Sequence, residues 1–164
     1  MAVTVQKSNE YTNATANPVV HNNTTEEHGR VRIAFFTHLQ DGTGDTGSSV
    51  ALVKLPPGRV RLLGPMSSAY VNWTTSSATL DLGWDAYTNM AGATVAADPD
   101  GLVDGLSVDT AGFFTFEGAI AANVLLGSSL VFESKDGVVI RATATDNAQV
   151  DGDDIVGYMA YVLD

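Results

Sequence analysis

The sequence contains no cysteine, so disulfide bonds, thiolate chemistry and cysteine-based zinc sites are excluded. It has no apolar run of roughly eighteen residues and no basic N-terminal segment followed by an apolar one, so it predicts neither a membrane-spanning helix nor a secretory signal. Aromatic residues make up 8% of the chain and do not alternate with basic residues. A surface for stacking nucleic-acid bases is therefore not expected.

Basic residues are also scarce, with 8 Lys and Arg against 19 Asp and Glu and a formal net charge of −11. This balance argues against binding to nucleic acid or to anionic membrane, because both need clustered cations. The charge is uneven: residues 1–80 carry a net +1 and residues 81–164 a net −12. Two interpretations stay open for the basic residues, which either share a face that docks on an acidic surface or are scattered and solvated. Five of them fall close together in the sequence: Arg30, Arg32, Lys54, Arg59 and Arg61.

Motifs that would carry catalysis are missing. The three histidines fit no zinc template, and no Gly-x-Ser-x-Gly nucleophile motif occurs. A polysaccharide-degrading enzyme would need two positioned carboxylates. Because the chain has 19 Asp and Glu residues, a possible pair can always be found in the sequence, so such a pair is no evidence for this activity. Asp-rich turns at 41–45, 98–100 and 151–154 offer oxygen ligands, but none has the spacing of an EF-hand loop. The sequence therefore predicts no enzyme activity, no cofactor and no metal site.

What the sequence does contain is a series of short β-type runs separated by turns rich in Gly, Pro and Asp. In the first run Val31, Ile33 and Phe35 share one face. Residues 98–101 have the composition of a turn, and residues 135–137 that of a hairpin connection. With no long amphipathic helix, the pattern predicts an all-β sandwich or jelly roll. The predicted strands cover residues 30–39, 50–55, 59–63, 66–73, 78–84, 113–116, 123–126, 130–133, 138–145 and 155–163.

The two ends of the chain differ strongly. Residues 1–29 are polar and rich in Asn and Thr, which predicts an extended arm that either orders on a partner or stays disordered, next to a β-sandwich domain at residues 30–164. Residues 155–163 form a strand that is apolar on both faces. Such a strand is either central and covered on both sides, or it lies at a subunit contact.

Four segments resemble a family of small tailed-bacteriophage virion proteins, the head decoration or capsid cement proteins. They are an aliphatic strand leading into Pro-Pro-Gly and Arg-Val-Arg-Leu-Leu-Gly (50–64), Thr-Leu-Asp-Leu-Gly-Trp (79–84), Leu-Val-Asp-Gly-Leu-Ser-Val-Asp (102–109) and the C-terminal segment 153–164. The likeness covers roughly residues 50–164. It implies a β-sandwich bound to the outside of an icosahedral shell, expected as a homotrimer and without catalytic residues.

This resemblance sets the functional expectation. The chain is expected to bind the major capsid protein and further copies of itself, on the exterior of a virion assembled in the bacterial cytoplasm, without binding nucleic acid or membrane. A head-fibre, tail or host-receptor-binding component is the alternative. The residues expected at the contacts with capsid or with other subunits are Val19, Val20, Arg30, Arg32, Arg59, Arg61, Tyr158, Met159 and Tyr161.

Overall fold

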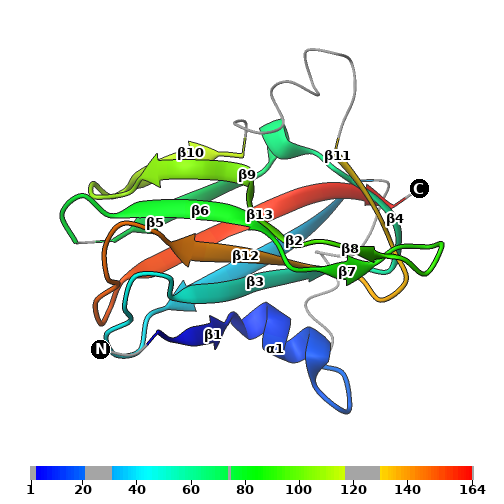
Figure 1. Ribbon diagram of the computed structural model, residues 1–164, viewed down its shortest axis with the longest axis horizontal. Helices are drawn as coiled ribbons and strands as arrows, with labels where there is room; N and C mark the ends of the chain where they lie inside the picture. The colour runs from blue at the N-terminus through cyan, green and yellow to red at the C-terminus, as the bar shows by residue number, and fades with distance from the viewer. Residues whose placement is uncertain (1–2, 21–30, 74, 117–129, 164) are drawn as a thin grey trace.

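Two β-sheets packed face to face make up most of this computed structural model, which describes residues 3–20, 31–73, 75–116 and 130–163 (Figure 1). Sheet A contains, in spatial order, β1 (Val5–Lys7), β3 (Ser49–Leu55), β12 (Val138–Ala144), β6 (Thr79–Trp84) and β9 (Asp98–Ser107). Sheet B contains β10 (Gly112–Thr115), β5 (Ser68–Asn72), β13 (Asp154–Leu163), β4 (Gly58–Leu62), β11 (Leu130–Ser134) and β2 (Val31–Leu39). The smaller elements are helix α1 (Asn9–Thr15), the 3-10 helix η2 (Gly64–Met66) and the hairpin of β7 (Tyr87–Thr88) and β8 (Thr94–Val95).

Alternating side chains place one face of each sheet in a shared core. In β12 and β6 every second residue is buried, and the same alternation holds in β4 and β5 of sheet B. Each large apolar side chain buried in this way contributes about 1.5–3 kcal/mol relative to leaving it in water. The predicted all-β sandwich of the jelly-roll type is confirmed. The largest fully buried side chains are Phe36, Leu52, Leu55, Leu62, Leu80, Leu82, Leu102, Phe116, Phe132, Ile140 and Ile155.

Strand β13 is central in sheet B. It pairs with β2 along one edge, and with β5 and then β4 along the other. Ile155 and Met159 point into the core, whereas Val156 on the opposite face is exposed. The strand is therefore central, as the first of the two alternatives predicted, but it is not fully covered on both sides. On its outward face Ala160 is buried, whereas Val156 is exposed.

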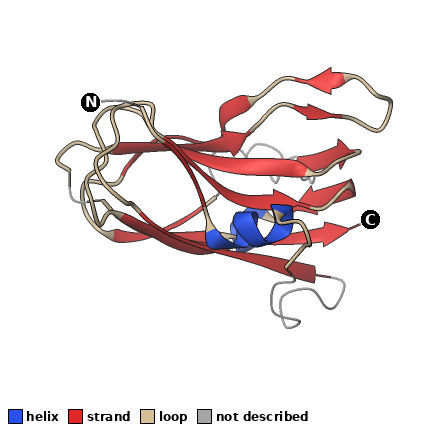
Figure 2. Cartoon of the chain, turned by 90° about the horizontal axis from the view of Figure 1, so that it is seen from below, coloured by secondary structure: helices blue, strands red, loops and turns tan. Residues whose placement is uncertain are grey.

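The N-terminal segment differs from the predicted extended arm in residues 3–20. Strand β1 pairs in parallel with β3, and α1 contacts both β2 and β3, so that it lies across the side of the sandwich (Figure 2). Ser8 begins the helix: its hydroxyl accepts a hydrogen bond from the Tyr11 N–H and donates one to the Leu52 carbonyl. The Ser8 cap and the pairing of β1 with β3 keep this polar segment against the sandwich, although it has little apolar surface of its own. The predicted boundary between residues 29 and 30 lies outside the described residues.

Two turn predictions need correction. Residues 98–101 belong to β9, because Gly83 and Gly101 let β6 and β9 approach so closely that an added Cβ would collide with the Asp98 backbone or the Trp84 ring. Residues 135–137 do turn the chain, but they connect β11 in sheet B with β12 in sheet A instead of closing a hairpin. The strand predicted at residues 123–126 lies outside the described residues.

Candidate interaction surface

The outer face of sheet B carries a cluster of apolar and aromatic side chains that the core does not use. Phe113 on β10 is 83% exposed, and Phe35 on β2 and Val156 on β13 are exposed as well. Tyr70 and Tyr158 lie between them and are half-buried. We call these five residues the aromatic face. Contiguous exposed apolar surface of this kind marks interaction sites in soluble proteins.

The strand register brings the aromatic face together. Tyr158 is paired with Phe35 across β13 and β2, with ring centroids 5.8 Å apart. Tyr70 is paired with Phe113 across β5 and β10, with ring centroids 5.0 Å apart. Between the two aromatic pairs lies a groove of about 410 Å³, lined also by Ser68, Ala69 and Gly157. Rings of this kind bury large areas at low cost in side-chain entropy, so they suit the centre of a protein contact.

Gly157 makes room for close packing beneath this groove. A Cβ added there would lie 2.5 Å from the Ser68 carbonyl oxygen and 2.7 Å from the Phe36 ring. Because Gly157 has no side chain, β13 and β5 approach closely and Phe36 packs beneath the strand. A larger residue would displace one of these neighbours.

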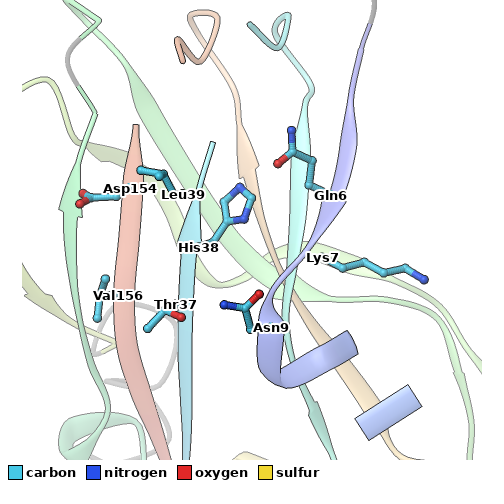
Figure 3. Close-up of a pocket in the computed structure, with 8 residues that line it drawn as sticks. All are labelled: Gln6, Lys7, Asn9, Thr37, His38, Leu39, Asp154 and Val156. Carbon is cyan, nitrogen blue, oxygen red and sulfur yellow. The ribbon is translucent and has the colours of Figure 1, made fainter. Parts of the chain in front are cut away.

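A second groove, of about 380 Å³, lies at the free edge of β2 between that strand, β1 and the start of α1 (Figure 3). The His38 ring lies between β2 and β1, with Nε2 3.5 Å from the Gln40 side-chain oxygen. Burial lowers the pKa of His38, and the contact with Gln40 opposes this shift to a smaller extent. On the other side of the groove, Asp154 has a buried Oδ1 atom with no hydrogen-bond partner. Asp154 and Val156 connect this polar groove with the aromatic face.

The outer face of sheet A has the opposite character. Arg141 on β12 donates two hydrogen bonds to the Asp85 carboxylate, at 2.6 and 2.7 Å, and a third to the Ser49 hydroxyl. The hydrogen bonds to Asp85 raise the pKa of Arg141. On β9, a hydrogen bond to Asp100 is the main cause that raises the pKa of Asp98. The outer face of sheet A thus carries a partly buried ion pair and acidic side chains, whereas the aromatic face lies on sheet B.

The basic residues do not gather on one face. Arg59 and Arg61 lie on the outer side of β4 in sheet B, where Arg59 is 3.7 Å from Glu133. Lys54 lies on β3 of sheet A, and Arg32 is paired with the buried Tyr161 at one end of sheet B. Arg30 lies outside the described residues. The interpretation of one shared basic face is therefore not supported by the residues that the structure describes.

The other predicted contact residues divide into surface and core. Val19 and Val20 follow α1 and are exposed, and Tyr158 belongs to the aromatic face. Met159 and Tyr161, by contrast, are buried in the core, so they are not presented to a partner. The reason is strand alternation: Met159 and Tyr161 share the inward face of β13, and Tyr158 lies on the outward one.

Sequence reasoning missed Phe35, Tyr70, Phe113 and Val156 as surface residues. The run of Val31, Ile33 and Phe35 on one side of the first strand was the available signal, but that side points outward and Phe36 enters the core. The other large aromatic side chains belong to the core: Trp73 is buried in it, and Trp84 and Tyr87 pack against it.

Two further kinds of feature bear on function in the described residues: metal sites and membrane-spanning helices. They contain no group of three or more His, Asp or Glu side chains that could hold a metal ion. Within the same residues, no helix has the length and apolar character needed to cross a membrane.

The fold is similar to chains of two solved capsid structures. A chain of the capsid of Ralstonia phage GP4 aligns with a TM-score of 0.62 and 13% sequence identity, over 98% of this chain and 98% of that one. A chain of the cyanophage Pam1 capsid asymmetric unit aligns with a TM-score of 0.51 and 14% identity, over 88% of this chain and 94% of that one. No family model matches the sequence, and no curated protein matches it. At these identities the likeness establishes the fold, which is a jelly-roll-like sandwich found in phage capsids.

Proposed function

We propose that this chain is a structural virion protein that binds the outer surface of a phage capsid and stabilises the shell, without catalysis. The observation that carries this proposal is the end-to-end similarity to a chain of the phage GP4 capsid, which covers 98% of both chains. The two chains are thus about equal in length. The likeness to decoration proteins in residues 50–164 supports the same role from the sequence.

The surface of the molecule also supports a role in assembly. The aromatic face lies on one side of the sandwich, and much of the remaining described surface is polar and acidic. A protein bound on a shell needs an apolar contact on one side and a charged, soluble surface on the other.

The proposed partners are the major capsid protein and further copies of this chain, arranged as a trimer. Repeated weak contacts over a lattice add up to strong attachment, so each single contact can stay modest in size. Binding to the assembled form alone would stabilise the shell by mass action. The proposed location is the capsid exterior, after assembly in the bacterial cytoplasm.

A head-fibre, tail or host-receptor-binding component is the second candidate. The observation that favours it is the exposed Phe113 beside Tyr70, because an exposed aromatic pair is also suited to binding a receptor. The position of the protein in the particle separates the two candidates.

The test is to add the purified protein to expanded phage heads that lack it and to examine the particles by cryo-electron microscopy. Density at regular lattice positions, with raised resistance of the heads to heat, is the expected result. Density confined to a vertex or tail would favour the second candidate, and no binding to any part of the particle would contradict both.

A further inference from the structure

We propose that the aromatic face is the surface that docks on the shell, and that it receives an apolar protein segment carrying one Lys or Arg side chain, which pairs with Asp154. This inference rests on the proposed function and names the chemistry of the partner. The argument combines three observations on the described residues: the exposed rings, the unsatisfied carboxylate and the overall charge.

The rings supply the apolar part of the contact. Phe113 on β10 is largely exposed, although the next residue, Phe114, packs against the core, and Phe35 on β2 and Val156 on β13 are exposed as well. The groove of about 410 Å³ between the aromatic pairs is large enough to receive side chains from another protein. Covering this face would remove the exposed apolar surface from water and would leave the core unchanged.

Asp154 supplies the charged part. Its Oδ1 atom is buried without a hydrogen-bond partner, which is costly. The residue as a whole is only half-buried, so a donor on a partner can approach the carboxylate. Asp154 lines the second groove, at the free edge of β2. Lys7, which lines that groove too, points away from Asp154, and its Nζ atom lies 5.2 Å from the centre of the Tyr11 ring (Figure 3). A basic side chain on the partner would therefore meet a carboxylate that the chain itself does not neutralise.

The net charge favours a basic partner over a second copy of this chain. Each copy carries a formal charge of −11, so two copies repel each other at long range, whereas a partner with exposed Lys or Arg is attracted. A second copy stays the alternative occupant, and measuring the oligomeric state distinguishes it.

The experiment measures binding of full-length variants to phage heads that lack the protein, at several NaCl concentrations. Phe113→Asp places a charge on the aromatic face, and its matched control is Met90→Asp, at another exposed apolar side chain between β7 and β8. Asp154→Asn removes the charge, and its control is Asp104→Asn, at an exposed position on β9. Sedimentation velocity and thermal unfolding of each free variant report its oligomeric state and its folding.

We expect Phe113→Asp to weaken binding about tenfold or more, as at a contact hot spot. Asp154→Asn should weaken binding several-fold and reduce its dependence on NaCl, and both controls should bind like the unmodified protein. If Phe113→Asp unfolds, Phe35→Ser replaces it, with the same expected loss of binding.

Three outcomes would overturn the inference. If the unmodified protein does not bind heads, the proposed function fails and this inference fails with it. If the unmodified protein binds and the aromatic-face variants bind equally well, the docking surface lies elsewhere while the proposed function stands. If the variants change the oligomeric state of the free protein without changing its affinity for heads, a second copy covers the face.

Discussion

Tyr158 and Met159 are consecutive residues of β13 whose side chains lie on opposite faces of sheet B. Met159 is 0% exposed in the core, whereas Tyr158 lies on the outer face with its ring 5.8 Å from that of Phe35. Of these two consecutive residues, Met159 therefore stabilises the core, whereas Tyr158 is available for contact with a partner.

This relationship predicts unequal effects of truncation. Met159→Ala should lower the free energy of unfolding by about 2–5 kcal/mol, because it leaves a cavity in the core. Tyr158→Ala should cost about 0.5–1.5 kcal/mol, since it mainly loses the contact with Phe35. Urea unfolding followed by circular dichroism measures both. Equal losses would contradict the placement of the two side chains.

Gly157 should not tolerate a side chain. Gly157→Ala should destabilise the fold by about 1–3 kcal/mol, because its Cβ would collide with the Ser68 carbonyl and the Phe36 ring. Gly112→Ala on β10 is the matched control, since the nearest atom to its Cβ would be 3.8 Å away. Thermal unfolding of the two variants tests this. A neutral Gly157→Ala would show that β13 and β5 can move apart.

The pair of Arg141 and Asp85 should contribute measurably to stability. A double-mutant cycle with Arg141→Met and Asp85→Asn should give a coupling energy of about 1 kcal/mol, because the contact is bidentate and partly buried. The more exposed pair of Arg59 and Glu133, at 3.7 Å, is the control and should couple by about 0–0.5 kcal/mol. The prediction fails if the two cycles give the same coupling energy.

Ser8 should anchor the N-terminal segment. Ser8→Ala removes the cap of α1 and leaves the buried Leu52 carbonyl without its donor, which should cost about 1–2 kcal/mol. The control, Thr15→Ala at an exposed position of the same helix, should change stability by less than about 0.5 kcal/mol. Hydrogen exchange of the α1 amides should also quicken in Ser8→Ala. Unchanged exchange would mean that other contacts hold the helix.

His38 should make stability depend on pH. Burial lowers the pKa of His38 below its ordinary value of 6.5, so the unfolded chain binds this proton more tightly than the folded chain. The free energy of unfolding should therefore decrease as the pH falls below 6.5 toward the lowered pKa, and stay level with respect to this group above 6.5. His38→Gln should lose less stability than the unmodified protein over that range. Parallel pH profiles for the two proteins would rule out this role of His38.

The positions of most strands could be predicted from the alternation of apolar residues and from the turn residues between them. The strands predicted at 30–39, 50–55 and 138–145 match β2, β3 and β12 within one or two residues. Alternation and turn residues carry this information, because both act between neighbours in the chain. The prediction of a turn at 98–101 was wrong, because Gly83 and Gly101 on two neighbouring strands make room there for strand pairing.

The candidate site could not be predicted in the same way. The apolar run of Val31, Ile33 and Phe35 was visible, but its direction depends on which face of β2 meets sheet A. The burial of Met159 and Tyr161 depends equally on the packing of the two sheets. Similarly, the polar N-terminal residues suggested an arm, whereas their docking depends on the backbone of β3 and on the Leu52 carbonyl, distant in sequence.

The sequence by itself determined that this protein is a cysteine-free, acidic β-sandwich without a recognisable catalytic motif, because composition, alternation and turn chemistry are local properties. Only the tertiary structure decided which face of each strand is buried and which strands share a sheet. It thereby placed Phe35, Tyr70, Phe113, Val156 and Tyr158 together on one outer surface. The physical reason is that a strand apolar on both faces can pack only one of them against the opposite sheet of a two-layer sandwich.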